Sequence, residues 1–146
     1  MARPKSAYRY LSKIALADIA FVARGGTLPA LFEASARALT EVMVDRKTLV
    51  GKTEKTIELT SPSPDRLLYD FLSELIVIKD VDSLLFKEFD VSIKEGRNLK
   101  LTCAMKGEEI DRERHGLRND VKAVTMHMFG IRKAAGRWEA TVVLDI

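Results

Sequence analysis

The sequence predicts an α+β fold, an α/β sandwich in which two amphipathic helices pack on a mixed, mostly antiparallel β-sheet. Two segments have the helical spacing of apolar residues, and six or seven others resemble strands, most of them by alternating apolar and polar residues. Both helical segments follow a capping residue and carry proline in the first turn. No repeat or long linker divides the chain, so we expect a single domain over residues 1–146.

The N-terminal part is predicted to form two strands and a helix. Strand-like residues occupy positions 8–11 and 17–23, and Gly25-Gly26 then breaks the chain. Apolar residues recur with helical spacing over 28–43, with Thr27 as a reasonable N-cap. A ladder of charges at four-residue spacing lies on another face of this helix: Glu33, Arg37 and Glu41.

The middle of the chain predicts a strand, a second helix and a hairpin. Residues 55–60 alternate as a half-buried strand does. Ser63 is the predicted N-cap of the second helix, whose wide apolar face over 67–78 requires cover by a sheet or by several elements. Alternation over 89–94 and 99–105 predicts a hairpin with one solvated face.

The last third predicts a loop and two strands. Charges crowd residues 107–120, so we expect an exposed loop there. Residues 121–131 are apolar at both odd and even positions, which favours a central strand covered on both sides. Alternation over 138–144 predicts the closing strand.

Composition narrows the class of protein. The formal net charge of +3 permits contact with RNA without requiring it. The single cysteine, Cys103, excludes an internal disulfide framework and fits a reducing compartment. No apolar run approaches the roughly 20 residues of a membrane span. The basic start lacks the apolar core of a secretory signal, so we expect a cytoplasmic protein without membrane contact. The cations of this basic start, before Asp18, are Arg3, Lys5, Arg9 and Lys13.

Two acidic residues near the chain ends are the strongest candidates for a site. Asp18 and Asp145 both lie among strand-like apolar residues, where an uncompensated carboxylate costs several kcal/mol. If their strands were neighbours, these side chains and the terminal carboxylate of Ile146 would converge as ligands for a hard divalent ion. Alternatively, each aspartate flanks its strand and faces solvent. The residues alone do not decide between these interpretations.

The sequence contains few residues or motifs that indicate any other catalytic or metal-binding site. The sequence lacks a Ser/His/Asp order, a phosphate-binding glycine loop and a Cys-x-x-Cys pair, so an ordinary enzyme is disfavoured. We interpret His115 as a solvated loop histidine and His127 as a strand histidine bonded to a neighbouring backbone group. Two histidines and Cys103 do not make the usual zinc ligand set. Lys122 has the plain interpretation of a lysine that extends from its strand into water.

Five short fragments occur in order over nearly the whole chain. They are Ala17-Asp-Ile-Ala-Phe21, Leu67-Leu-Tyr-Asp-Phe-Leu-Ser-Glu-Leu75, Gly107-Glu-Glu109 leading to His115, Val121-Lys-Ala-Val-Thr125 with His127, and Val143-Leu-Asp-Ile146. In their order and spacing these fragments resemble the archease family, small proteins that assist the RNA-splicing ligase acting on tRNA halves. Each fragment is weak alone, but the combination is specific.

The resemblance implies a non-catalytic activator of that ligase in tRNA splicing, promoting nucleotidylation of the ligase and its multiple turnover. It implies a metal site at Asp18, Asp145 and Ile146, and it implicates Lys122 in activation. Oxygen donors suit a hard divalent cation better than a soft metal, and we expect calcium, with magnesium or manganese as alternatives. The usual first motif of the family, His-Thr-Ala-Asp, is Ala15-Leu-Ala-Asp18 here, so functions that require the histidine are in doubt.

Two competing classes of function remain at this point. One is a chaperone-like partner of tRNA-modifying enzymes such as tRNA methyltransferases, acting through the basic N-terminus and loops and in contact with tRNA. The other, ranked last, is a small metal-dependent hydrolase, because the sequence offers neither an evident base nor a nucleophile.

Overall fold

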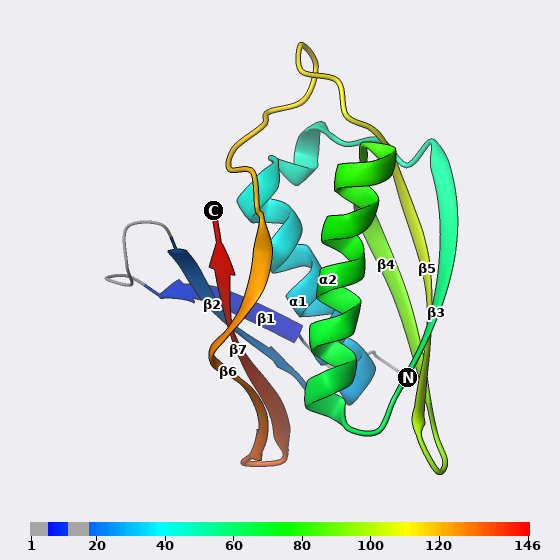
Figure 1. Ribbon diagram of the computed structural model, residues 1–146, viewed down its shortest axis with the longest axis vertical. Coiled ribbons are helices and arrows are strands. Elements are labelled where there is room, and N and C mark those ends of the chain that lie inside the picture. The colour runs from blue at the N-terminus through cyan, green and yellow to red at the C-terminus, as the bar shows by residue number, and fades with distance from the viewer. Residues whose placement is uncertain (1–5, 12–17) are drawn as a thin grey trace.

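The computed structural model describes residues 6–11 and 18–146, which form two antiparallel sheets with two helices between them (Figure 1). The strands are β1 (Ser6–Leu11), β2 (Asp18–Gly25), β3 (Thr53–Ser61), β4 (Leu84–Glu95), β5 (Leu99–Glu109), β6 (Ala123–Ala134) and β7 (Arg137–Asp145). The helices are α1 (Leu28–Met43) and α2 (Pro64–Asp82), and η1 (Arg46–Thr48) is a short 3-10 turn.

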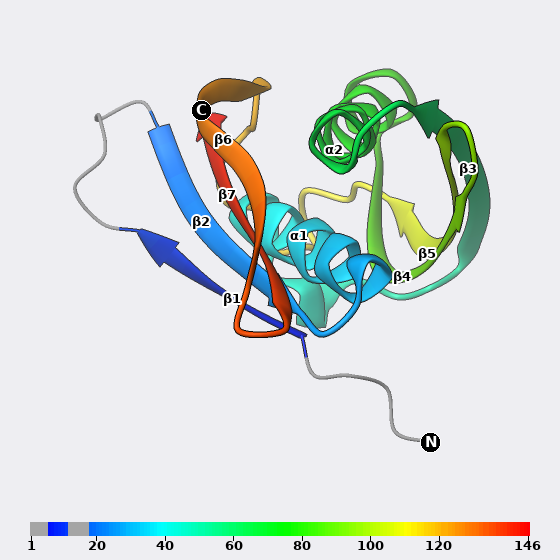
Figure 2. The same cartoon turned by 90° about the horizontal axis from the view of Figure 1, so that it is seen from below.

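The strand orders are β1-β2-β7-β6 in one sheet and β3-β5-β4 in the other. Seen from below, the helices form the middle layer between the sheets (Figure 2). The α+β class and both helices are confirmed. The expected single mixed sheet is instead two sheets, and every strand pairing among the described residues is antiparallel.

Helix α1 is buried on nearly all sides because it lies between the two sheets. The side chain of Thr27 caps the helix, accepting a hydrogen bond from the amide of Ala30 at 3.2 Å. Glu33 belongs to the predicted charge ladder but is only 3% exposed, and its carboxylate accepts a hydrogen bond from the amide of Val91 on β4 at 2.9 Å. The ladder therefore does not form one solvated stripe.

Helix α2 begins as the sequence predicts. The side chain of Ser63 accepts a hydrogen bond from the amide of Arg66 at 3.3 Å, and Pro64 opens the helix. The apolar face is buried against the core, as its width requires. In the described part of the chain, no helix is both long enough and apolar enough to cross a membrane.

Strand β6 differs from its predicted position at the centre of a sheet. It is an edge strand, next to β7 only. The register jumps from Thr125 opposite Val143 to Gly130 opposite Thr141, so residues 126–129 bulge opposite the single Val142. Met126 and Met128 are 61% and 49% exposed. The apolar residues at odd and even positions thus belong to a bulged edge strand and not to a strand covered on both sides.

Candidate functional site

The two aspartates singled out in the sequence lie next to each other in the sheet. Asp18 is the first residue of β2, Asp145 is the last residue of β7, and the register places them directly opposite one another. Opposite residues of an antiparallel pair project to the same face, with Cβ atoms about 4.5–5.5 Å apart. Both residues are half-buried. The two carboxylates therefore share one face at one end of the sheet.

The segment before β6 completes this end of the sheet. Ala123 lies opposite Asp145 on its other side, and the amide of Lys122 donates a hydrogen bond to the carbonyl oxygen of Asp145 at 2.8 Å. The side chain of Lys122 is exposed, and Ile146 is half-buried against the core. We call Asp18, Lys122, Asp145 and Ile146 the acidic tip. The start of β2 and the C-terminus lie side by side at this end of the sheet (Figure 2).

The charges of the acidic tip are not compensated inside the described fold. Neither Asp18 nor Asp145 forms an ion pair with a described residue, and like charges directly opposite in a sheet are destabilising. Carboxylate oxygens are ligands that calcium, magnesium and manganese prefer. The donor chemistry therefore fits a hard divalent cation.

The number of side-chain ligands at the acidic tip is small. Among the described residues, no group of three or more His, Cys, Asp or Glu side chains is placed to hold a metal ion. Asp18 and Asp145 supply two carboxylates, and Ile146, the third residue of the expected set, directly follows Asp145. The residues Ala15-Leu-Ala, which stand where the family usually has His-Thr-Ala, lie outside the described residues.

A buried lysine of α2 fixes the backbone just before Lys122. The Nζ of Lys79 donates to Oδ1 of Asp120 at 2.6 Å and to the carbonyl oxygen of Val121 at 2.8 Å, and it also pairs with Asp80 at 2.8 Å. Burial lowers the pKa of Lys79, but its bonds to Asp120 and Asp80 outweigh burial, and the pKa is raised. The position of Lys122 is thus tied to the end of α2.

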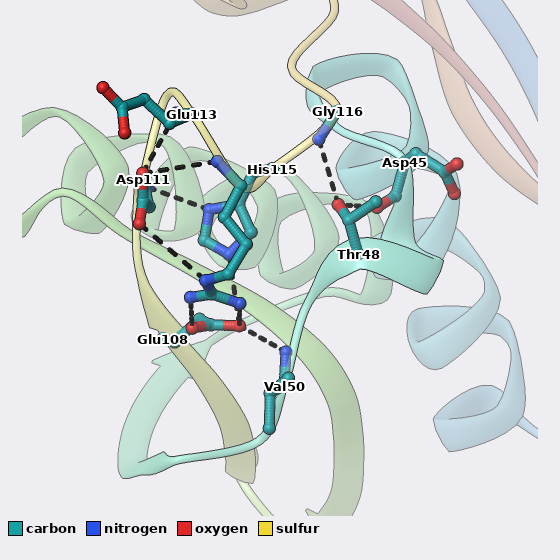
Figure 3. Close-up of polar contacts among 9 residues, drawn as sticks. Asp45, Thr48, Val50, Glu108, Asp111, Glu113, His115 and Gly116 are labelled. Atoms are coloured by element: carbon teal, nitrogen blue, oxygen red, sulfur yellow. Dashed lines mark hydrogen bonds and ion pairs between the residues drawn. The ribbon is translucent and has the colours of Figure 1, made fainter.

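The other end of this loop is held by Glu108, the next-to-last residue of β5 (Figure 3). Its side chain is 4% exposed and forms a bidentate ion pair with Arg114. It also accepts a hydrogen bond from the amide of Val50. The Arg114 guanidinium lowers the pKa of Glu108 to about 2, against the opposing effect of burial. Glu108 is therefore a charged anchor between two segments distant in sequence.

His115 is buried beneath the same loop, so its interpretation as a solvated histidine is wrong. Nδ1 accepts a hydrogen bond from the amide of Asp111 at 2.9 Å, which places the proton of the neutral ring on Nε2. Nε2 lies 3.1 Å from Oε2 of Glu108, outside the alignment of a hydrogen bond. The side chain is 0% exposed, so this carboxylate–imidazole pair has no access to a substrate.

The sequence contained one signal for this anchor, the fragment Gly107-Glu-Glu109 leading to His115. The pattern did not show that the histidine turns inward. Figure 3 shows the ring beneath the loop, with Asp111 on one side and Glu108 on another. The close turn from Asp111 to His115 is closed by the His115 amide, which donates to the Asp111 carbonyl oxygen at 2.8 Å.

The remaining candidates for chemistry are not arranged as a catalytic group. Burial raises the pKa of the Cys103 thiol to about 12, which leaves it protonated and inert. His127 lies exposed on the β6 bulge, and its ring forms no hydrogen bond with a described residue. The prediction that the His127 side chain bonds to a neighbouring backbone group is therefore wrong. The exposed position follows from the bulge, which turns residues 126–128 outward.

The fold is that of a small two-sheet α+β protein, in which two acids pair at the end of neighbouring strands. Residues 8–146 match the Archease protein family (MTH1598/TM1083), and the chain belongs to this family. It is 38% identical over 141 residues to "Protein archease" of Methanosarcina mazei, covering 95% of each chain. It is 43% identical over 131 residues to "Protein archease" of Methanothermobacter thermautotrophicus, covering 89% of this chain and 93% of the relative.

Solved structures agree with the fold. The solution structure of Methanobacterium thermoautotrophicum protein 1598 has a TM-score of 0.82 and 37% identity, over 95% of this chain and 98% of that chain. A crystal structure from Thermotoga maritima, described as an archease and possible chaperone, has a TM-score of 0.60. At 20% identity, over 94% of this chain and 99% of that chain, it is similar in fold alone.

Proposed function

We propose that this chain is a non-catalytic activator of the tRNA-splicing RNA ligase. It promotes nucleotidylation (guanylylation) of the ligase and multiple turnover during tRNA splicing in the cytoplasm. The observation that carries the proposal is the register of β2 and β7, which sets Asp18 opposite Asp145 with no described cation to balance them. Membership in the archease family supports it.

The residues of the acidic tip have separate roles in this proposal. Asp18, Asp145 and the carboxylate of Ile146 would hold a divalent cation, calcium first and magnesium or manganese as alternatives. Such an ion, when bound, offsets phosphate charge. Lys122 is exposed and tied through its amide to Asp145, so its ammonium is available for the phosphates of the nucleotide at the ligase active site. The acidic tip is thereby the surface that docks on the ligase.

Single-turnover nucleotidylation of the cognate ligase tests this function. The purified chain should accelerate nucleotidylation in the presence of a divalent cation, and Asp18→Ala or Asp145→Ala should abolish the acceleration. Asp82→Ala is the matched control, because Asp82 is an exposed aspartate at the end of α2. Full stimulation by Asp145→Ala would refute the role of the acidic tip.

A chaperone-like modulator of tRNA-modifying enzymes, such as tRNA methyltransferases, is the second candidate. It is favoured by the exposed methionines Met126 and Met128 on the edge strand, since exposed methionines suit adaptable contacts with proteins. The double variant Asp18→Ala/Asp145→Ala separates the candidates. It should retain stimulation of a methyltransferase if the chaperone-like function holds, whereas it should fail with the ligase under the first proposal.

A further inference from the structure

The end of the four-stranded sheet opposite the acidic tip is basic. Here β6 and β7 meet in a tight hairpin whose turn residues, Ala135 and Gly136, have φ of 52° and 72° (Figure 1). Between Gly130 and Trp138 the chain carries three cations and no acid. These cations are Arg132, Lys133 and Arg137. We call residues 130–138 the basic hairpin.

Two of these cations form no ion pair with any residue that the structure describes. Glu139 pairs with Arg132 at 3.0 Å and with Arg24 at 2.8 Å, so one carboxylate serves two guanidinium groups. Arg137 is exposed and forms no ion pair with a described residue. The Nζ of Lys133 lies 5.2 Å from the centroid of the Trp138 ring, as a cation–π contact. Lys133 and Arg137 thus remain available to anions.

An open hollow adjoins Lys133, whereas Arg137 lies next to it at the turn of the hairpin. Trp138, the only tryptophan of the chain, is half-buried and lines the hollow together with Lys133. The hollow has a volume of about 510 Å³. Among the described residues that line it, Glu95 is the only carboxylate. The other lining residues are Gly26, Thr27, Leu28, Pro29 and Ile93.

We infer that the basic hairpin binds a single-stranded polynucleotide, with a base against Trp138 in the hollow and phosphates on Lys133 and Arg137. Proteins that bind single strands combine aromatic side chains, on which bases stack, with cations that follow the backbone. The lysine stem is long and flexible, so Lys133 can leave the ring for a phosphate. A nucleobase uses both the ring and the cations, whereas the acidic side chains of a protein segment would use the cations alone.

This inference does not depend on the proposed activation of the ligase, because it concerns binding by the purified chain alone. It adds a second surface at the far end of the sheet from the acidic tip. A polynucleotide held there is kept away from the carboxylates of Asp18 and Asp145, which would repel its phosphates.

The emission of Trp138 provides a direct test, because the protein has one tryptophan. Titration with a short single-stranded polyuridine RNA should change this emission, and affinity should fall with salt with a log–log slope of about −1.4 for two phosphates. Titration with polydeoxyuridine shows whether the site binds RNA alone or also single-stranded DNA. Stacking and phosphate pairing predict that both strands bind, and a response to RNA alone supports the same site with RNA as its ligand.

Charge reversal tests the assignment of the surface. Lys133→Glu/Arg137→Glu should weaken RNA binding by about tenfold or more and bring the salt slope close to zero. The matched control is Lys47→Glu/Arg112→Glu, which changes net charge equally in η1 and the 110–122 loop, at the other end of the molecule (Figure 1). All four side chains are exposed, so both variants should unfold at similar temperatures.

Three outcomes would overturn the inference. The first is the absence of RNA binding at low salt, which would leave an acidic protein as the better partner for this surface. The second is binding, measured by anisotropy of labelled RNA, without a change in Trp138 emission. The third is an equal loss of affinity in the control variant, which would show a diffuse response to net charge.

Discussion

At the scale of single residues, charge compensation separates the structural carboxylates from the candidate functional ones. Glu33 and Glu108 are almost completely buried, and each accepts a hydrogen bond from a backbone amide of another segment. Asp18 and Asp145 face each other without an ion pair to any described residue. Because no described residue supplies a balancing charge, a cation bound at the acidic tip would stabilise the protein.

The variant Asp145→Asn should have opposite effects with and without a divalent cation. In the presence of a chelator it should raise the free energy of unfolding by about 0.2–1 kcal/mol, because it removes like-charge repulsion across the strands. With calcium, the wild type should gain several degrees in Tm, since an ion that binds only the folded state stabilises it. Asp145→Asn should lose this gain. Thermal unfolding followed by circular dichroism measures both effects.

The exposed residue Asp82 provides the control for this measurement. Asp82→Asn removes one negative charge and should keep the full calcium-dependent rise in Tm. An equal calcium response in Asp145→Asn and the wild type would exclude Asp145 as a ligand, whatever the ligase assay shows.

The lowered pKa of Glu108 predicts that the free energy of unfolding falls at acidic pH. Its pKa is lowered from 4.5 to about 2, mainly by the side-chain bonds from Arg114. A carboxyl with a lowered pKa in the folded state stabilises the fold above its unfolded pKa, and this stability is lost as the pH falls through the folded pKa. The wild type should therefore lose on the order of 2 kcal/mol between about pH 4.5 and pH 2 through this residue.

The variant Glu108→Gln isolates this contribution. At neutral pH it should be less stable than the wild type, and its free energy of unfolding should fall less steeply over the same acid range. Urea unfolding at a series of pH values measures the difference. Parallel pH profiles for the two proteins would show that the pair with Arg114 contributes nothing to stability.

The sequence identified several single residues correctly and missed others for a physical reason. The caps Thr27 and Ser63 were predictable because a capping side chain bonds to an amide only a few residues away. His115 was not, since its burial depends on contacts with Glu108 on β5. The pairing of Asp18 with Asp145 is only a hypothesis from the sequence, because it requires the register of strands that are distant in the chain.

At the scale of elements, the helices were more predictable than the position of each strand. The helical spacing over 28–43 and the cap at Ser63 correspond to α1 and α2. The apolar residues of β6 suggested a central strand, but an edge strand with a bulge contains the same residues. The difference lies in the partner strand, where Val142 alone faces residues 126–129. A local pattern has no information about that partner.

Gly107 should be required for the pairing of β4 and β5. A Cβ at this position would lie 1.9 Å from the carbonyl oxygen of Leu85 and 2.6 Å from the Cα of Phe86, next to the irregular register between Phe86 and Glu88. Because both contacts are backbone atoms, neither can move without shifting the strand. Gly107→Ala should therefore cost about 3 kcal/mol of unfolding free energy.

Gly96→Ala is the matched control in the turn between the same two strands. A Cβ there would meet only the carbonyl oxygen of Asn98, at 3.7 Å, so its cost should stay within about 0.5 kcal/mol. Chemical denaturation of both variants gives the comparison. Similar stabilities for the two would mean that β4 and β5 can separate at Gly107 without a penalty.

At the scale of the whole molecule, the division of strands between two sheets could not be read from the sequence. The number and kind of elements follow from local patterns, whereas strand order depends on which segments meet across the helical layer. The first sheet joins β1 and β2 to β7 and β6, from opposite ends of the chain. This long-range closure is what creates one acidic end and one basic end in the same sheet.

The order of strands also makes the two chain ends unequal, which can be tested with short extensions. Strand β7 lies between β2 and β6, so Ile146 follows a strand end flanked by Asp18 and Ala123. Strand β1 is at the edge, and Ser6 pairs with Gly25 at the far end of β2. A Gly-Ser extension after Ile146 should therefore displace its carboxylate and reduce the calcium-dependent rise in Tm. The same extension before Met1 should leave this rise intact.

Ligase stimulation should follow the same asymmetry if the acidic tip docks on the ligase. The extension after Ile146 places extra residues at the docking surface, so stimulation should be lost together with the calcium response. Both extended proteins should fold alike in circular dichroism, because each addition lies beyond the paired strands. An extension after Ile146 that preserves both the calcium response and the stimulation would remove the carboxylate of Ile146 from the site and confine the metal ligands to Asp18 and Asp145.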